Sequence, residues 1–208
     1  MAERDIRERD ILVAPNEYAY VQDLTKGNVV LYVSPTKISI SNTERLIVME
    51  EGRFAPVRGE ESALGVHRFI EATSSQYIIL ENPPIDPESA PVRGANSAVA
   101  LQFGRKVVVP GPAEFPLWPG QRAQVLDGHE LRPNEYTANE GAIGTEIIVG
   151  GSDVSFYIPK TGLEVVPDKD RYVRQAWRMD FNTGLHLRVI SAFEANERDQ
   201  VPAGSYTT

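Results

Sequence analysis

Hydrophobic and polar residues alternate along short stretches of this chain. Residues 37–41 read Lys-Ile-Ser-Ile-Ser and residues 185–189 read Leu-His-Leu-Arg-Val, so apolar side chains recur at every second position. A period of two is typical of a β-strand with one buried face. Runs of this kind, together with short apolar runs, predict strands at Ile11–Ala14, Tyr18–Gln22, Val29–Val33, Ile38–Ser41, Leu46–Met49, Tyr77–Leu80, Val99–Phe103, Lys106–Val109, Glu146–Val149, Val154–Ile158, Leu163–Val166 and Leu185–Ile190.

The pattern predicts an all-β chain. Neighbouring strands start about 8–12 residues apart, the spacing of all-β domains. Thr25–Asn28 lies between two runs and predicts a hairpin turn, since Gly and Asn tolerate a positive φ. Helix is confined to, at most, a short turn in Ala2–Asp10 or in Gly59–Gly65.

Two phrases recur along the chain. Pro-Asn-Glu-Tyr stands at Pro15–Tyr18 and again at Pro133–Tyr136. An aromatic residue followed within three positions by Pro stands at Tyr32–Pro35 and at Tyr157–Pro159. Fixed phrases at long spacing indicate tandem modules, here of roughly 40–60 residues each. We therefore predict β repeats at residues 1–66 (with a charged lead-in), 67–126, 127–166 (compressed) and 167–208 (incomplete).

Composition narrows the classes of function. The 208 residues carry 21 Lys+Arg against 29 Asp+Glu, a net charge of −8, which argues against a protein whose main task is to bind nucleic acid. No stretch has the ~18–20 consecutive apolar residues of a membrane-spanning helix. The absence of cysteine removes disulfides, thiolate metal sites and cysteine nucleophiles.

No group of residues predicts catalysis, a metal or a cofactor. His67, His129 and His186 are far apart in sequence, and none has a second ligand at metal-binding spacing. Asp168 and Asp170 lack the regular spacing and closing Glu of a calcium loop, and Gly150–Asp153 lacks the Lys of a phosphate loop. We expect a non-enzymatic protein without a cofactor.

The charged lead-in alternates basic and acidic residues between Ala2 and Asp10. Because the charges neutralise one another, this segment is expected to be a solvated lead-in and not an arm that binds nucleic acid. The same mixed charge could also pair with the start of another copy of the chain, an alternative that the sequence leaves open.

Colinear phrases along most of the chain carry a resemblance to the N-terminal repeat region of the major vault proteins. Ile11–Asp23 resembles the opening of the first repeat of that family, and Phe115–Gly120 (Phe-Pro-Leu-Trp-Pro-Gly) is similar to the phrase that closes the second. Leu131–Asn134 and Leu163–Val166 resemble parts of the third repeat. Val201–Gly204 resembles part of the first half of a fourth, so the sequence is interpreted as a fragment or a shorter relative.

The resemblance implies small antiparallel β-sheets arranged in tandem as an elongated stave. Staves of that family stand side by side and form the wall of a hollow cage. The implied partners are further copies of the same chain and an enclosed cargo, with neither nucleic acid nor membrane bound directly, and the implied location is the cytoplasm. No catalytic residues belong to such repeats.

Three functions remain open from the sequence. The first is a self-assembling structural protein of a cage or shell. The second is a sleeve or ring component of a virion or another large particle, and the third is a monomeric repeat scaffold that binds a protein partner. Prolines at strand starts and aromatic residues that bury a ring suit contacts between modules. The candidate residues for these seams and for assembly are Pro15, Tyr18, Pro35, Phe115, Trp118, Pro119, Tyr157 and Pro159.

Overall fold

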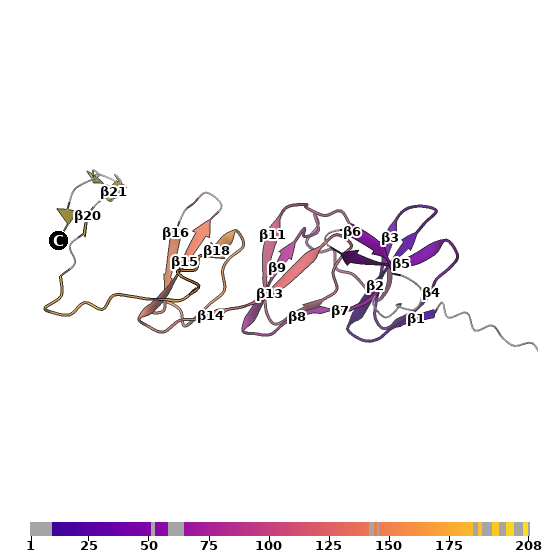
Figure 1. Cartoon of the computed structure of the whole chain (residues 1–208), viewed down its shortest axis with the longest axis horizontal. Coiled ribbons are helices and arrows are strands. Elements are labelled where there is room, and N and C mark those ends of the chain that lie inside the picture. The colour runs from indigo at the N-terminus through magenta and orange to yellow at the C-terminus, as the bar shows by residue number, and fades with distance from the viewer. Residues whose placement is uncertain are drawn as a thin grey trace, which may run out of the picture.

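The computed structural model is an elongated row of small antiparallel β-sheets (Figure 1). It describes residues 10–50, 53–57, 65–141, 144, 146–184, 187–188, 193–195, 199–201 and 206–207. The described residues form strands, turns and loops, and the predicted all-β class is confirmed. Most of the lead-in and of Gly59–Gly65 lies outside the described residues.

One strand pattern occurs three times. In unit 1 (residues 10–50), β1 (Asp10–Val13) pairs with β4 (Thr36–Ser39), while β2 (Glu17–Asp23) lies between β3 (Val29–Val33) and β5 (Glu44–Glu50). Unit 2 (residues 70–127) pairs β8 (Ile70–Ala72) with β12 (Ala113–Phe115) and places β9 (Gln76–Glu81) between β11 (Lys106–Pro110) and β13 (Arg122–Asp127). Unit 3 (residues 129–165) pairs β14 (His129–Glu130) with β17 (Phe156–Tyr157) and places β15 (Glu135–Gly141) between β16 (Glu146–Gly150) and β18 (Leu163–Val165).

The central strand of each unit begins with the same turn. Glu17, Gln76 and Glu135 stand at the start of β2, β9 and β15, a constant spacing of 59 residues. Each of the three side chains accepts a hydrogen bond, 2.9–3.1 Å long, from the backbone N–H three residues earlier. The repeated Pro-Asn-Glu-Tyr phrase is this turn in units 1 and 3, so its interpretation as a repeat is confirmed.

The second repeated phrase is not a structural repeat. Pro35 follows β3, the third strand of unit 1, whereas Pro159 follows β17, the fourth strand of unit 3. In unit 2 the place of Pro35 is taken by Pro112, which follows Gly111 after β11, and both prolines follow cis peptide bonds. A short aromatic-to-proline phrase carries too little information to fix its position in the unit.

Shorter strands join neighbouring units. β7 (Val66–Arg68) pairs with β2, and β19 (Arg174–Gln175) pairs with β15. β10 (Gly94–Ser97) belongs to the long connection between β9 and β11 but pairs with β3 of unit 1. The repeat boundaries stay predictions, and backbone hydrogen bonds span those near residues 66 and 166.

The remaining strands complete the description. β6 (Arg53–Pro56) pairs with β5. Near the C-terminus β20 (Leu187–Arg188) pairs with β23 (Tyr206–Thr207), and β21 (Phe193–Ala195) pairs with β22 (Asp199–Val201).

Most predicted strands are present, and the exceptions are of two kinds. Val99–Phe103 forms no strand but only an isolated bridge between Leu101 and Pro84. The two longest strands that the sequence did not predict are β13 and β15, which are rich in charged and small residues and lack an apolar run. The other strands that it did not predict are no longer than four residues: β6, β7, β8, β10, β12, β14, β19, β21, β22 and β23. The hairpin at Thr25–Asn28 is confirmed: Gly27 has φ 73° and donates its N–H to the Asp23 carbonyl at 2.7 Å.

Candidate functional site

The contact between units 1 and 2, here the first seam, is a closed apolar core. Tyr20, Leu31 and Ile47 of unit 1 pack in one cluster with Leu117 and Trp118 of unit 2. The Tyr20 hydroxyl donates a hydrogen bond of 2.8 Å to the Leu117 carbonyl. A phenol can bury its ring and still satisfy its polar end, which is what this seam uses. Burial raises the pKa of Tyr20 far above its ordinary value.

Trp118 lies at the centre of this seam. Its side chain is 5% exposed, and its Nε1–H donates to the Ser89 carbonyl at 3.2 Å. Its backbone N–H donates to the side-chain oxygen of Gln121 at 2.9 Å. Gln121 is itself buried and donates its amide to the Asn82 carbonyl at 3.1 Å. Hydrogen bonds from both the indole and the backbone of Trp118 therefore fix its position in the seam.

The long connection between β9 and β11 (residues 82–105) seals the first seam. It supplies β10 to the edge of β3, and its Val99 and Leu101 pack against the shared core. The buried Asn96 amide donates to the Leu31 carbonyl at 3.3 Å. A polar side chain with its hydrogen bond satisfied can be buried at low cost, so the connection packs tightly on unit 1.

The predicted seam residues differ in burial. Tyr18, Trp118 and Pro159 are buried, Phe115, Pro119 and Tyr157 are half-buried, and Pro15 and Pro35 are exposed. The structure brings Tyr18, Phe115 and Trp118 into the core of the first seam. It places Tyr157 and Pro159 in and just after β17 of unit 3. Their role in assembly stays a prediction.

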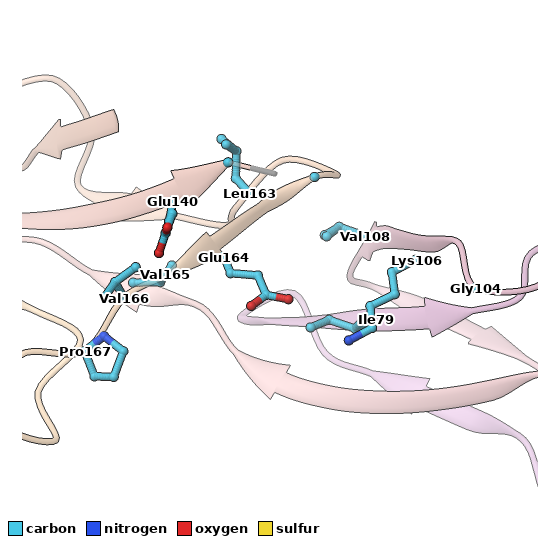
Figure 2. Close-up of a pocket in the computed structure, with 12 residues that line it drawn as sticks. Ile79, Gly104, Lys106, Val108, Glu140, Leu163, Glu164, Val165, Val166 and Pro167 are labelled. Carbon is cyan, nitrogen blue, oxygen red and sulfur yellow. The ribbon is translucent and has the colours of Figure 1, made fainter. Parts of the chain in front are cut away.

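The contact between units 2 and 3, here the second seam, contains a groove (Figure 2). Two adjoining cavities of about 590 and 510 Å³ share the lining residues Ile79, Lys106, Val108, Leu163, Glu164 and Val165. The backbone N–H of Val108, on the edge strand β11, donates to the Thr161 hydroxyl across the seam at 3.0 Å. The name "groove" is kept below for these cavities.

Register shows why the second seam is more open than the first. Ile79 and Val108 of unit 2 hold the sheet positions that Tyr20 and Leu31 hold in unit 1. In unit 1 these side chains are 2% and 0% exposed, because unit 2 covers them. In unit 2 the same face borders the groove, and Lys106 takes the place of the apolar Val29.

Two replacements in unit 3 account for the opening. The connection from β15 to β16 is only a few residues long, so it has no counterpart of residues 82–105. Lys160 of unit 3 holds the position that Trp118 holds in unit 2. The Leu163 N–H donates to the Lys160 carbonyl, and in unit 2 the Gln121 N–H donates to the Trp118 carbonyl in the same way. Lys160 is exposed, whereas Trp118 is buried.

The groove carries an acidic pair at its side. Glu140 on β15 lies directly opposite Glu164 on β18, and like charges at opposite positions of an antiparallel pair repel each other. Among the described residues neither carboxylate has an ion-pair partner, whereas Lys106 contacts Glu81 at 3.5 Å. Figure 2 shows Glu164 on the same side of the seam as Glu140, with Lys106 across from it.

Two histidines lie close to the seams. The ring centroid of His67, on β7, lies 5.4 Å from that of Tyr18 and 6.0 Å from that of Tyr20. The ring centroid of His129, on β14, lies 5.5 Å from that of Tyr172. In both histidines Nε2 is buried without a hydrogen-bond partner among the described residues, and burial lowers the pKa of each imidazole. The described residues contain no group of three metal-ligating side chains, and His186 lies outside them.

No family model matches the chain. A search of curated proteins finds no match either. Within the part of the chain that the structure describes, no helix is long and apolar enough to cross a membrane.

Proposed function

We propose that this protein is a non-enzymatic structural protein that assembles with copies of itself into the wall of a cage or shell. The observation that carries the proposal is the threefold repetition of one β unit along an elongated row, with a shared core at the first seam. A row of repeated units, two of which share a core at the first seam, suits an elongated stave. Such units expose long sides on which other copies can pack.

Open sheet edges support the same function. β11, β13, β16 and β18 each have a single strand neighbour among the described strands. Ile147 and Ile148 on β16 are exposed, as is Val125 on β13. Unpaired edges with exposed apolar side chains favour pairing with another chain. Where two different edges meet, the contact between copies is heterologous and builds a ring, shell or filament.

The test is the molar mass of the full chain in solution, measured by light scattering over a wide range of protein concentration. We expect a large species of discrete mass, and electron microscopy of that species would separate a cage from a ring. A mass of 23 kDa at every concentration would contradict self-assembly of this chain.

The groove favours a second candidate function, a monomeric scaffold that binds a protein partner. Binding sites form preferentially between packed units, and this groove combines apolar walls with charged side chains. A chain that is monomeric at all concentrations, and in which substitutions in the groove abolish capture of a partner, would favour this function over the first.

A further inference from the structure

Residues 177–181 (here the aromatic segment) expose unusually large apolar side chains. Trp177 is 88% exposed, Met179 is 53% exposed and Phe181 is fully exposed. They alternate with Arg178 and Asp180, so in an extended conformation all three lie on one side and the charges on the other. A stripe of three large apolar side chains exposed to solvent indicates a binding surface.

Tyr77 and Tyr172 line the groove, but none of its lining residues is a counterpart of Trp118. At the first seam the equivalent sheet face is covered by Trp118 together with Val99 and Leu101. At the second seam Lys160 replaces the tryptophan and leaves the face of β9 and β11 open. An aromatic side chain from outside unit 3 would complete the apolar cover as Trp118 does.

The charges of the two surfaces are complementary. Glu140 and Glu164 lie opposite each other without an ion-pair partner among the described residues. Arg178, directly after Trp177, would relieve their repulsion and form charge-assisted hydrogen bonds with them. Asp180 would then be placed to interact with Lys106, whose contact with Glu81 is long, at 3.5 Å.

The aromatic segment points away from the groove of its own chain. Arg174 pairs with Tyr136 and Gln175 pairs with Glu135, so the chain runs antiparallel to β15 toward its first residue. The Ala176 N–H continues this direction by donating to the Asn134 carbonyl at 2.8 Å. The larger cavity of the groove lies at the opposite end of β15, beside Glu140 and Gly141. Tyr172 lines the smaller cavity, but Trp177 is 88% exposed and does not line either cavity. A second copy of the chain is therefore the source of a segment that fits.

We propose that the groove of one copy binds the aromatic segment of a second copy. This inference rests on the proposed self-assembly and names two surfaces that make contact. Since the groove and the segment are different surfaces, the contact is heterologous, and its repetition joins each copy to the next in a ring or an open chain.

The chain has no cysteine, which allows a direct test by disulfide cross-linking. One preparation carries Val108→Cys in the groove, and a second, with a tag of different size, carries Met179→Cys. The control for the first preparation is Leu24→Cys, which places an exposed thiol in the unit 1 hairpin. Circular dichroism checks that each variant is folded, and light scattering gives its mass before oxidation.

Mixed and oxidised, the groove and segment variants should form the mixed-tag dimer at least about tenfold more than the control pair, because docking raises the local thiol concentration. Adding Arg178→Glu to the segment variant should bring the yield back toward that of the control. Equal yields from the two pairs would overturn the inference. If the preparations are then still large assemblies, self-assembly stands and only this contact fails, whereas monomers with equal yields would contradict both proposals.

Discussion

Truncation of Trp118 to alanine tests whether units 1 and 2 are held together at the first seam. The indole is 5% exposed and packs in a cluster with Tyr20, Leu31 and Leu117, which come from both units. Because these neighbours belong to two packed units, we expect them to relax only partly into the space that the indole leaves. We therefore expect a cavity to remain.

The magnitude follows from the buried area. A buried tryptophan removes about 150–250 Å² from water, which corresponds to about 4–6 kcal/mol at roughly 25 cal/mol per Å². Alanine retains a small part of this, so about 3–5 kcal/mol should be lost from the free energy of unfolding. The hydrogen bond from Nε1 to Ser89 accounts for about 1 kcal/mol of the total.

The assay is chemical and thermal unfolding followed by far-ultraviolet circular dichroism, which does not depend on tryptophan emission. For a domain of this size, roughly 2–4 °C is lost per kcal/mol, so Tm should fall by about 6–20 °C. Phe103→Ala is the matched control, since that aromatic side chain is 78% exposed and its removal should change stability by less than about 0.5 kcal/mol. Equal Tm values for the wild type and Trp118→Ala would refute the first seam as a stabilising core.

Three further predictions address the two seams and the unit. Burial lowers the pKa of His67 and His129, so the unfolded chain binds protons more readily than the folded chain. The free energy of unfolding should therefore be constant above about pH 7 and fall as the pH drops through 6.5 toward 5. Replacing both histidines with Phe should flatten this dependence, as measured by thermal melts at a series of pH values. Gly111→Ala places a methyl group against the Thr73 carbonyl and should lower the free energy of unfolding by more than about 2 kcal/mol in a denaturant titration. The control is Gly184→Ala, whose added methyl group meets no described atom within 4 Å and should leave the free energy of unfolding unchanged. Replacing residues 84–101 with a short turn removes β10 and part of the core cover, so binding of a hydrophobic dye should rise; unchanged dye binding and Tm would contradict the sealing role of this connection.

The sequence predicted most of the strands that carry apolar runs, and it showed the Pro-Asn-Glu-Tyr phrase that marks the repeated unit. Tyr18–Gln22 and Val29–Val33 are strands as expected, because their side chains face a core on at least one side. β15 was missed because its buried positions are Thr137, Ala138 and Asn139, which no hydropathy pattern marks as core. The spacing of 59 residues between Glu17, Gln76 and Glu135 was present in the sequence and would have aligned the three units.

The groove could not be predicted from local pattern. It depends on which residues of unit 3 meet the face of unit 2, and therefore on the register of strands far apart in the sequence. Lys106 is an unremarkable charged residue in the sequence, and it becomes informative only when its position is matched to that of Val29 in unit 1. In the same way Trp118 was selected as a seam residue, but Tyr20 and Leu117, which join the two units by a hydrogen bond, were not.

The comparison of the two seams is the strongest argument for where this protein makes contacts. One fold unit occurs three times, so differences in how neighbouring units meet cannot be attributed to the fold. Where Trp118 and the long connection are present, the face of the preceding unit is fully buried. Where Lys160 and a short connection replace them, the same face is left with apolar walls and with carboxylates that have no ion-pair partner among the described residues. A purely structural spacer would gain stability by closing both seams alike. The open second seam, in a chain that also exposes Trp177 and Phe181, is consistent with an apolar face that a second molecule covers.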